Sequence, residues 1–323
     1  MINYLKAPKI INIELTSYCP LNCKQCYKRK ENLDEIHLDF NRLNSIIDEA
    51  GKINISKILF SGGEPFYYKY FNEAVKLVKK NNFILYISTG GYGITYDKLT
   101  YLKQYKLDAL YISLNGSTKE INDKSRYGFV EAINTMELSK KIDLPIRINW
   151  VARSDNVYDF KNILTLAEKY HVEEIDILRN KPDDSGNISS QLTYEELKYL
   201  AECYINYSNS SVKLNIESCY NELRNLCKIR IKNSVLKGCS GGKYSLSVNA
   251  KGEFSPCAHM RSTTYTSNYE RIIDFWEKSD EIKRFRIEKS YDYCKTCSYK
   301  EYCFPCIIAK EKSECLIKES DVI

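Results

Sequence analysis

The residues best suited to chemistry are three cysteines in the short stretch SYCPLNCKQCYK, residues 17–28. Cys19, Cys23 and Cys26 have the spacing C-x3-C-x2-C and follow the apolar run IINIEL. Three thiols on one short loop cannot all form disulfides with one another. Each is therefore an unmodified thiol, part of a disulfide with a cysteine elsewhere, or a ligand of a shared metal site. Three thiolates can ligate three irons of a [4Fe–4S] cluster and leave the fourth iron open. The alternatives are a structural zinc site, with His37 as the nearest histidine, or incidental cysteines.

The whole chain contains 13 cysteines among 323 residues. Its first residues, MINYLKAPK, lack the apolar segment of a secretory signal, so we expect a cytoplasmic protein. Disulfides are disfavoured in a reducing cytoplasm, and an odd number of cysteines cannot form a complete disulfide framework. The cysteine content therefore predicts metal ligands or catalytic thiols.

A second group of cysteines occupies the C-terminal third of the chain. Its spacing is C-x12-G-x4-C, a gap, C-x2-C-x5-C-x2-C, a further gap and one last cysteine. Gly252 lies in an expected hairpin turn that brings the first two cysteines together. The C-x2-C elements also suit zinc ribbons, which are the alternative to iron–sulfur clusters. The group consists of Cys239, Cys257, Cys294, Cys297, Cys303, Cys306 and Cys315.

Alternating apolar strands and amphipathic helices must position the first cysteine loop. The expected strands lie at 9–15, 56–62, 83–89, 107–114, 144–152 and 173–179. The expected helices lie near 39–53, 70–81, 96–105, 118–141, 157–170 and 193–207. This alternation predicts an α/β fold with parallel strands and right-handed crossovers. Six repeats predict a partial (β/α)6 TIM-like barrel with its chemistry at the carboxyl ends of the strands.

The alternation stops after the turn-rich stretch NKPDDSGNISSQ, residues 180–191. We therefore predict a barrel in residues 1–190, a bridging helical segment in 191–238 and a small cysteine-rich domain in 239–323. Within the last domain, KYSLSVNAKGEFSPC at 243–257 predicts a β-hairpin around an NAKG turn.

The net charge of +6 is mild and spread along the chain. Scattered lysines are typical of a solvated surface, so we expect no nucleic-acid partner. No apolar run approaches the roughly 18 residues of a membrane span, so we expect no membrane partner either.

An ordered series of motifs resembles the radical S-adenosylmethionine (SAM) enzymes. CPLNCKQC follows the first expected strand, SGGEP the second, ISTGG the third and SLNGSTKEINDKSRYG the fourth. The resemblance covers essentially residues 10–190 and implies a [4Fe–4S] cluster held by Cys19, Cys23 and Cys26, with SAM on its open iron. It also implies that an electron donor such as flavodoxin or ferredoxin reduces the cluster. SAM cleavage then gives a 5′-deoxyadenosyl radical that removes hydrogen from an unactivated C–H bond.

The resemblance assigns the GGEP residues to the methionyl end of SAM. Gly62 and Gly63 allow close approach of the backbone because they lack a Cβ atom. Glu64 would accept hydrogen bonds from the SAM ammonium, and Pro65 would stiffen the turn. A GGEP sequence alone would be weak support, because glycine–proline turns are common.

Polar residues near the ends of the later strands complete the implied cofactor site. Ser113 and Asn115 would bind ribose hydroxyls, and Arg126 would pair with the SAM carboxylate through a bidentate fork. The alternatives are a simple turn at Asn115 and a surface ion pair at Arg126. Weaker pocket candidates are Ser88, Thr89 and Asn149.

One departure from the family pattern lies beside the third cysteine. The aromatic residue often found just before that cysteine is Gln25 here, and Tyr27 follows the cysteine instead. This changes the expected adenine contacts, with Tyr27 as the aromatic cofactor-binding residue, and leaves the cluster ligands intact.

The C-terminal cysteines resemble a SPASM domain, which carries two auxiliary [4Fe–4S] clusters. The interleaving in that family implies that Cys239, Cys257 and Cys306 hold auxiliary cluster I. This cluster would lack one thiolate unless Cys219 or Cys227 supplies it. The final CFPC is one residue shorter than the usual C-x3-C spacing. Auxiliary cluster II would be held by Cys294, Cys297, Cys303 and Cys315.

Three cysteines and two histidines lie outside these motifs. Cys219 and Cys227 are the candidate catalytic residues, as hydrogen-atom donors to a substrate radical, unless one of them is a cluster ligand. Cys203 lies in a helical pattern and is expected to be a buried hydrophobic residue. His171 and His259 are expected to be structural or surface residues, although His259 is near enough in sequence to touch auxiliary cluster I.

Enzymes with a SPASM domain mostly act on peptides or protein side chains, which predicts a ribosomally synthesised peptide as substrate. The implied reaction is a thioether or carbon–carbon cross-link, or an epimerisation. The first strand begins by about residue 9, so a leader peptide would need a separate leader-binding protein or the barrel surface. The enzymatic alternatives are an anaerobic sulfatase-maturating, formylglycine-generating enzyme and a tetrapyrrole-modifying radical SAM enzyme. The alternative outside the enzymes is a zinc- or cluster-binding module.

Overall fold

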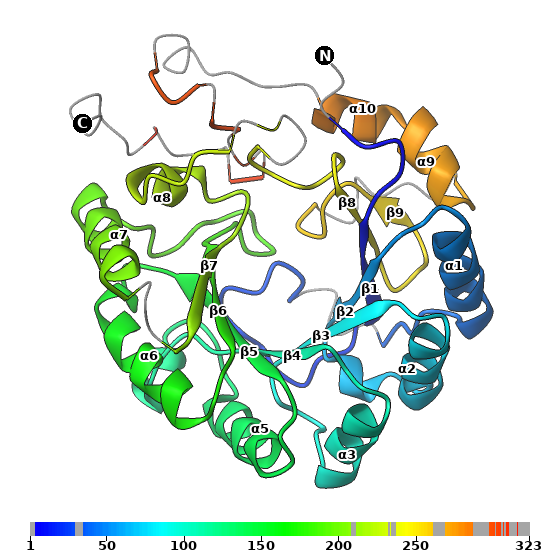
Figure 1. The fold of residues 1–323 in the computed structure, drawn as a ribbon, viewed down its shortest axis with the longest axis horizontal. Helices are drawn as coiled ribbons and strands as arrows, with labels where there is room; N and C mark the ends of the chain where they lie inside the picture. The colour runs from blue at the N-terminus through cyan, green and yellow to red at the C-terminus, as the bar shows by residue number, and fades with distance from the viewer. Residues whose placement is uncertain are drawn as a thin grey trace.

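The computed structural model describes residues 4–29, 35–207, 211–231, 233, 237–260, 269–286, 297–300, 302–304, 306, 308–309 and 315. Within these residues, one curved sheet has the strand order β7-β6-β5-β4-β3-β2-β1-β8-β9. Figure 1 shows the strands as an inner wall and most helices around its outside, with the N-terminal strands beside the C-terminal third of the chain. The predicted fold class, an α/β partial barrel with a C-terminal cysteine-rich region, is confirmed.

The first six strands run parallel and form the barrel wall. They are β1 (Ile10–Thr16), β2 (Lys57–Gly62), β3 (Ile84–Thr89), β4 (Ala109–Ser113), β5 (Ile146–Ala152) and β6 (Glu174–Arg179). The outer helices are α1 (Phe40–Lys52), α2 (Phe71–Lys80), α3 (Tyr96–Gln104), α5 (Phe129–Lys141), α6 (Phe160–Lys169) and α7 (Tyr194–Tyr207). Each of these elements was predicted to within a few residues, except that α5 was predicted as part of a longer helix.

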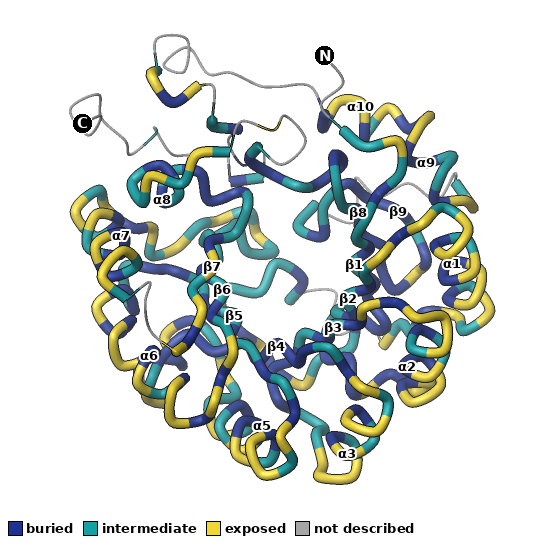
Figure 2. The backbone as a smooth tube through the Cα atoms, viewed as in Figure 1, coloured by how far each residue is buried: buried dark blue, intermediate teal, exposed yellow. Residues whose placement is uncertain are grey.

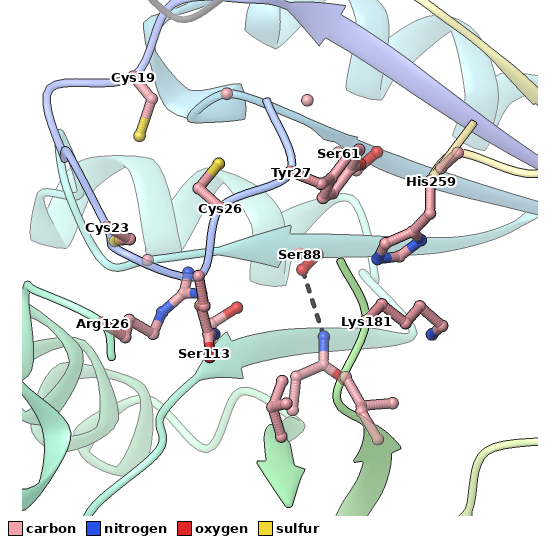
Figure 3. Close-up of a pocket in the computed structure, with 18 of the residues that line it drawn as sticks. Cys19, Cys23, Cys26, Tyr27, Ser61, Ser88, Ser113, Arg126, Lys181 and His259 are labelled. Atoms are coloured by element: carbon pink, nitrogen blue, oxygen red, sulfur yellow. Dashed lines mark hydrogen bonds between the residues drawn. The ribbon is translucent and has the colours of Figure 1, made fainter. Parts of the chain in front are cut away.

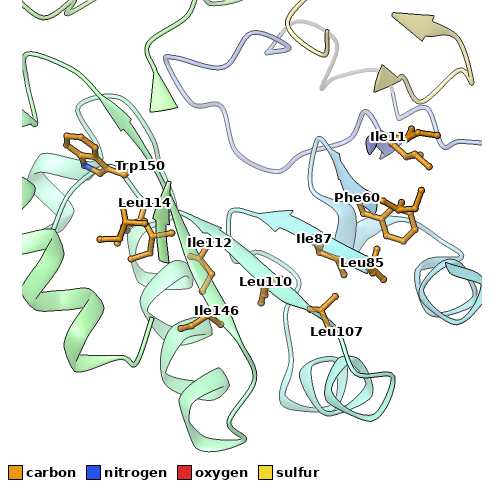
Figure 4. Packing of buried hydrophobic residues seen from close by; sticks show 14 of the residues in the cluster. Ile11, Phe60, Leu85, Ile87, Leu107, Leu110, Ile112, Leu114, Ile146 and Trp150 are labelled. Carbon is orange, nitrogen blue, oxygen red and sulfur yellow. The ribbon is translucent and has the colours of Figure 1, made fainter. Parts of the chain in front are cut away.

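The two faces of the sheet differ in chemistry because successive side chains of a strand point to opposite sides. Ile11, Phe60 and Ile87 are fully buried and pack between the sheet and the outer helices (Figure 4). Neighbouring positions on the other face carry polar side chains, such as Asn12 and Ser88, which line a cavity. Figure 2 shows mostly buried and intermediate residues along the inner strands and exposed residues on the outer helices. The apolar face stabilises the barrel and leaves the inner face free for binding.

The predicted helix at 118–141 is in fact two helices. A short α4 (Lys119–Asn122) is followed by a turn, and α5 then begins after Gly128, whose φ of +91° favours glycine. The Asn122 side chain holds this turn by donating to the Arg126 carbonyl at 2.8 Å. The break places Arg126 beside the carboxyl end of β4, which a continuous helix would not do.

The sheet also contains three strands beyond the predicted barrel. β7 (Lys213–Ile216) pairs parallel with β6 and was not predicted. The predicted hairpin is present as β8 (Ser245–Val248) and β9 (Phe254–Ser255), an antiparallel pair. β8 also pairs parallel with β1, so the hairpin extends the barrel sheet. The predicted domain boundaries near 190 and 238 therefore separate segments that all contribute strands to one sheet.

The hairpin turn packs directly on the barrel. The Arg42 side chain on α1 donates through Nη2 to the Gly252 carbonyl at 3.0 Å. Glu49 on the same helix accepts from the backbone N–H groups of Ile272 and Ile273 at 2.8 and 3.1 Å. These contacts fix the C-terminal third against the first helix of the barrel.

The shorter elements connect these parts. They are the 3-10 turns η2 (Pro65–Tyr67) and η3 (Val157–Asp159), and the helices α8 (Asn221–Leu226), α9 (Ile272–Lys278) and α10 (Asp280–Arg286). Among the described residues, no helix has both the length and the apolar character required to cross a bilayer.

Candidate functional site

A cavity of about 260 Å³ lies at the carboxyl ends of the barrel strands. Each of the strands β1 to β6 contributes to its wall. Figure 3 shows the three-cysteine loop on one side, with Lys181 and His259 across from Cys19 and Cys23. The strand residues that contribute polar groups to the lining are Asn12, Ser61, Ser88, Thr89, Ser113, Asn149 and Arg179.

The predicted cysteine loop forms one wall of this cavity. Cys19, Cys23 and Cys26 all line it, and none of the three forms a disulfide among the described residues. Burial raises the pKa of the Cys19 thiol to about 12, because a thiolate would be poorly solvated there. Cationic iron supplies the opposite charge that stabilises buried thiolates, so this donor set fits an iron–sulfur cluster.

The backbone holds the start of the cysteine loop tightly against the end of β2. Gly63 donates to the Thr16 carbonyl at 2.8 Å, and Glu64 donates to the Tyr18 carbonyl at 2.7 Å. A Cβ atom on Gly63 would lie 2.1 Å from the Tyr18 oxygen, which is far inside van der Waals contact. Glycine is therefore required for this approach.

Glu64 is fully enclosed at the centre of the GGEP turn. Its carboxylate accepts from the Thr89 hydroxyl at 2.7 Å and from the Gly90 N–H at 2.8 Å. Burial raises the pKa of Glu64 to about 7, although these hydrogen bonds and the Arg126 guanidinium favour the ionised form. The turn continues into η2, in which Pro65 is the first residue and is buried.

Arg126 brings a cation to the same wall of the cavity. Its charge favours the ionised forms of Glu64 and of Cys19. Its Nε atom is buried and has no hydrogen-bond partner among the residues that the structure describes. A buried donor without a partner is costly, and a bound carboxylate would satisfy it. The site therefore fits the SAM carboxylate that the sequence analysis assigned to Arg126.

Asn115 lies just after β4, and its side-chain amide makes hydrogen bonds to other protein groups. Its amide group donates to the Gln25 side chain at 2.9 Å and to the Ser125 hydroxyl at 2.8 Å. Its carbonyl oxygen accepts from the Val151 N–H at 3.1 Å. Gln25, the departure from the family pattern, thereby ties the cysteine loop to β4.

The other predicted polar residues lie on the inner face of the barrel. Ser113 and Ser88 line the cavity, and Asn149 donates to the Ser88 hydroxyl at 3.3 Å (Figure 3). These strand positions bring hydroxyl and amide groups together on one surface. They can hydrogen-bond a polar ligand.

Lys181 is a cavity residue that the sequence analysis missed. It follows β6, and its ammonium group pairs with the Glu217 carboxylate at 2.5 Å. Burial opposes its charge, yet Cys219, Glu217 and Cys306 together raise the pKa of Lys181. Its place directly after a strand was the only signal in the sequence, because no motif includes it.

His259 was expected to be a structural or surface residue that could touch auxiliary cluster I, and the structure places it in the cavity lining. Its ring stacks on Tyr27 with the ring centroids 4.2 Å apart and the planes at 29°. Burial, followed by the nearby Lys181 cation, lowers the pKa of His259 to about 3. The imidazole is therefore neutral at physiological pH.

A second thiol cluster lies beyond Lys181. Cys219, Cys239 and Cys306 form a small buried cluster with Phe285 and Phe304, and Cys257 packs against it. The Cys219 thiol hydrogen-bonds to the Cys306 sulfur, and this contact lowers the pKa of Cys306, as do the Lys181 and Arg179 cations. The structure therefore gathers the three predicted ligands of auxiliary cluster I and adds Cys219 to them.

Cys227 lies elsewhere. It caps α8 and packs against the main core, and burial raises the pKa of its thiol to about 12. Neither Cys219 nor Cys227 belongs to the described lining of the cavity. Cys203 is 3% exposed on α7, as expected for a buried hydrophobic residue. His171 is exposed in the turn after α6.

The predicted ligands of auxiliary cluster II are described only in part. Cys297 and Cys303 flank one turn, in which Lys300 donates to the Cys297 carbonyl at 3.2 Å and Cys303 donates to the Tyr299 carbonyl at 3.0 Å. Cys315 is half-buried, and Cys294 lies outside the described residues. This ligand set remains a prediction.

Two family models match the chain. Residues 13–167 match the radical SAM superfamily, and residues 239–298 match the SPASM iron–sulfur cluster-binding domain. The first match begins within β1 and covers the cysteine loop and strands β2 to β5, and the second covers the hairpin and the C-terminal cysteines through Cys297.

Relatives and solved structures agree with these matches. An AdoMet-dependent heme synthase of Methanosarcina barkeri is 22% identical over 95% of this chain and 93% of its own length. SuiB of Streptococcus suis bound to SAM has a TM-score of 0.81 at 17% identity, over 99% of this chain and 78% of SuiB. The enzyme anSMEcpe bound to AdoMet and a peptide has a TM-score of 0.72 at 18% identity, over 95% of this chain and 92% of that chain. At these identities the structural likeness shows a shared fold.

The fold, the cysteine loop and both matches define an enzyme that uses SAM and iron–sulfur clusters. The chain belongs to the radical SAM superfamily and carries a SPASM domain. Its radical SAM domain binds a [4Fe–4S] cluster and SAM, and its SPASM domain binds auxiliary iron–sulfur clusters. The alternative of a non-catalytic metal-binding module is therefore set aside.

Proposed function

We propose that this enzyme modifies a ribosomally synthesised peptide, by a thioether or carbon–carbon cross-link or by epimerisation. The observation that carries the proposal is the charge pairing in the cavity wall opposite Cys19 and Cys23. Arg179 forms an ion pair with Glu222, and Lys181 pairs with Glu217 at 2.5 Å. These two cations are thus already neutralised by protein carboxylates.

The remaining polar side chains that the strands contribute to the cavity lining are amides and hydroxyls. Asn12 and Ser61 hydrogen-bond to each other, and Asn149 donates to Ser88. Such neutral donors and acceptors suit the N–H and C=O groups of a peptide backbone. A tetrapyrrole with several carboxylates would instead require unpaired cations, because a buried charge without a partner is costly. A peptide is therefore the better fit to the described lining.

The comparisons supply two further supports. SuiB has also been solved bound to its precursor peptide SuiA, with a TM-score of 0.81 to this chain. The peptide-bound anSMEcpe structure has the same fold. Because anSMEcpe is bound to a peptide as well, the sulfatase-maturating alternative shares the substrate class and differs in the reaction.

We assign the cofactor groups to the residues that the sequence analysis named. Cys19, Cys23 and Cys26 would hold the cluster, while Glu64 would accept from the SAM ammonium and Arg126 would bind its carboxylate. When bound, the cluster and SAM supply hydrogen-atom abstraction from an unactivated C–H bond. The protein orients both partners and excludes water from the cavity.

Auxiliary cluster I has a complete set of four thiolates in this proposal. Cys239, Cys257 and Cys306 are joined by Cys219, which is 4% exposed and hydrogen-bonded to Cys306. With four thiolates, the iron atoms have no position left for a substrate atom. Cluster I would then pass electrons, and Cys219 would be a ligand rather than a hydrogen-atom donor.

The test is anaerobic reconstitution followed by incubation with SAM, an electron donor such as flavodoxin or ferredoxin, and candidate substrates. Peptides encoded beside the gene, a cysteine- or serine-containing sulfatase peptide and a carboxylated tetrapyrrole are compared by mass and by amino-acid chirality. We expect modification of a neighbouring peptide, by loss of two hydrogen atoms or by altered chirality at unchanged mass. A Cys23→Ser variant controls for background and should give no deoxyadenosine.

Two outcomes would contradict the proposal. Turnover of the tetrapyrrole with every peptide left unchanged would reassign the substrate class. Conversion of only the sulfatase peptide to formylglycine would reassign the reaction. If a separate leader-binding protein is required, its addition should restore peptide modification without changing SAM cleavage.

The raised pKa of Glu64 predicts that SAM binding depends on pH. A carboxylate with a pKa near 7 is mostly protonated at pH 6, and only its ionised form pairs with the SAM ammonium. SAM affinity should therefore rise about 8-fold between pH 6 and 7.5. Stability of the SAM-free chain should change in the opposite direction, falling as pH rises from 4.5 towards 7, because the folded state retains a proton that the unfolded state has lost.

Equilibrium binding of SAM to wild type and to Glu64→Gln measures this effect. The variant should bind SAM more weakly at pH 7.5 and should lose most of the pH dependence. An equally steep pH profile in the variant would show that another group titrates.

A further inference from the structure

Two loops that are far apart in the sequence meet inside the cavity. One follows the cysteine loop and carries Tyr27, directly after Cys26. The other belongs to the SPASM domain and carries His259, two residues after Cys257. The two rings stack with a centroid distance of 4.2 Å, and both line the cavity. An aromatic pair therefore connects the proposed SAM-binding loop to the proposed auxiliary-cluster loop.

The position of His259 is set by a compact turn at Cys257. Met260 donates to the Cys257 carbonyl at 3.1 Å, which closes the turn. The Ser255 hydroxyl donates to the same carbonyl at 3.0 Å. A cluster ligated by Cys257 would hold this turn in place and, with it, the imidazole ring.

The position of Tyr27 is likewise set by its neighbours. The Lys28 N–H donates to the Cys26 sulfur at 3.4 Å, and the Lys28 ammonium forms a buried ion pair with Glu14 on β1. The Cys26 carbonyl accepts from the Asp184 N–H at 3.2 Å. The backbone on both sides of Tyr27 is therefore anchored, and its ring is presented to His259 and to the cavity.

We propose that His259 is a positioning residue for the SAM site, which acts by holding Tyr27 through the ring stack. By this contact, occupancy of auxiliary cluster I at Cys257 strengthens SAM binding in the barrel. Because such coupling is reciprocal, bound SAM also stabilises the auxiliary cluster. The inference relies on the proposed ligands and not on the proposed substrate, so it can be tested with SAM alone.

The experiment measures the dissociation constant for SAM in the anaerobically reconstituted full chain. His259→Ala should weaken SAM binding about 2- to 10-fold, the range expected for loss of one aromatic pair. His259→Phe should restore most of the affinity, because it keeps a ring in the stack. Tyr27→Ala should weaken binding by removing the ring that would contact SAM in the cavity. The double variant should then be no worse than Tyr27→Ala, because His259 acts through Tyr27.

A second measurement distinguishes a role of His259 in positioning Tyr27 from a general loss of structure or of iron–sulfur clusters in the variant. The electron paramagnetic resonance spectrum of the reduced radical SAM cluster should change on SAM addition in wild type and His259→Phe, and change less in His259→Ala at the same SAM concentration. Iron content is measured for each variant. His171→Asn is the matched control, because His171 is exposed at a positive φ that asparagine also tolerates.

The coupling itself is tested at Cys257. Cys257→Ser should weaken SAM binding about as much as His259→Ala, whereas Cys203→Ser, at a buried thiol on α7 that belongs to neither proposed cluster, should leave it unchanged. Wild-type affinity in His259→Ala or in Cys257→Ser would overturn the proposal, as would additive losses in the double variant. None of these measurements involves the peptide, so their failure is distinct from failure of the proposed function.

Discussion

A Gly63→Ala chain is expected to bind SAM at least about 100-fold more weakly than wild type. The added Cβ atom would lie 2.1 Å from the Tyr18 oxygen and 2.3 Å from the Ser17 oxygen. Both are backbone atoms that cannot swing aside, so the GGEP turn and the cysteine loop must separate. A misplacement of about 1 Å can cost about 100-fold in the rate of a catalysed reaction, and we expect SAM affinity to fall by a similar factor. Overpacking of this kind also costs about 1–3 kcal/mol of stability.

Equilibrium SAM binding, iron content and thermal unfolding measure these effects. Gly51→Ala is the matched control, because its Cβ would first meet Phe83 at 3.9 Å near the end of α1. That variant should keep SAM affinity and gain about 0.5–1 kcal/mol of stability. Wild-type SAM affinity in Gly63→Ala would show that the loops can separate without loss of the site.

The Cys219→Ser variant is expected to lose auxiliary cluster I and with it substrate turnover. Iron content after reconstitution should fall from about 12 to about 8 atoms per chain if three four-iron clusters become two. Turnover should fall about 100-fold or more, since even groups that only support a metal ligand typically contribute 10- to 100-fold. SAM cleavage without substrate should continue at saturating SAM, because the three proposed ligands of the radical SAM cluster are unchanged.

Cys227→Ser separates the two candidate thiols. Its side chain packs on the main core rather than on the thiol cluster, so iron content and turnover should stay near those of wild type. The measurements are iron and sulfide content, the spectrum of the reduced protein and product mass. Loss of turnover with full iron content in Cys219→Ser would instead support a hydrogen-atom donor.

The sequence predicted the barrel because its strands and helices alternate with clear periodicity. It did not predict β7, since KLNI is four residues long and is recognisable as a strand only beside β6. It joined α4 to α5, because the turn between them depends on the side chain of Asn122 and on the positive φ of Gly128. Local patterns thus gave the long elements, and tertiary contacts determined the short ones.

The same distinction between local patterns and tertiary contacts applies to the residues of the candidate site. The candidate residues in motifs, such as Cys19 and Gly63, could be named from the sequence, because the ordered series of motifs resembles the radical SAM enzymes. Cys219, Lys181 and His259 belong to no motif, and each comes from a different connection. Only the folded sheet brings Lys181 and His259 to the cavity and Cys219 to the thiol cluster. Cys219 was left open between two roles because its distance in sequence from Cys239 says nothing about its distance in space.

The pairing of β1 with β8 has a consequence for how the enzyme is made. Ile10–Ile13 of the first strand bond on one side to β2 and on the other to Ser245–Val248. On the ribosome, a nascent chain that ends before residue 245 leaves that second edge bare, and a bare strand edge is prone to pair with other chains. Delivery of iron and sulfide to the cysteine loop that follows β1 should therefore be most efficient late, after β8 has been translated and has paired with β1.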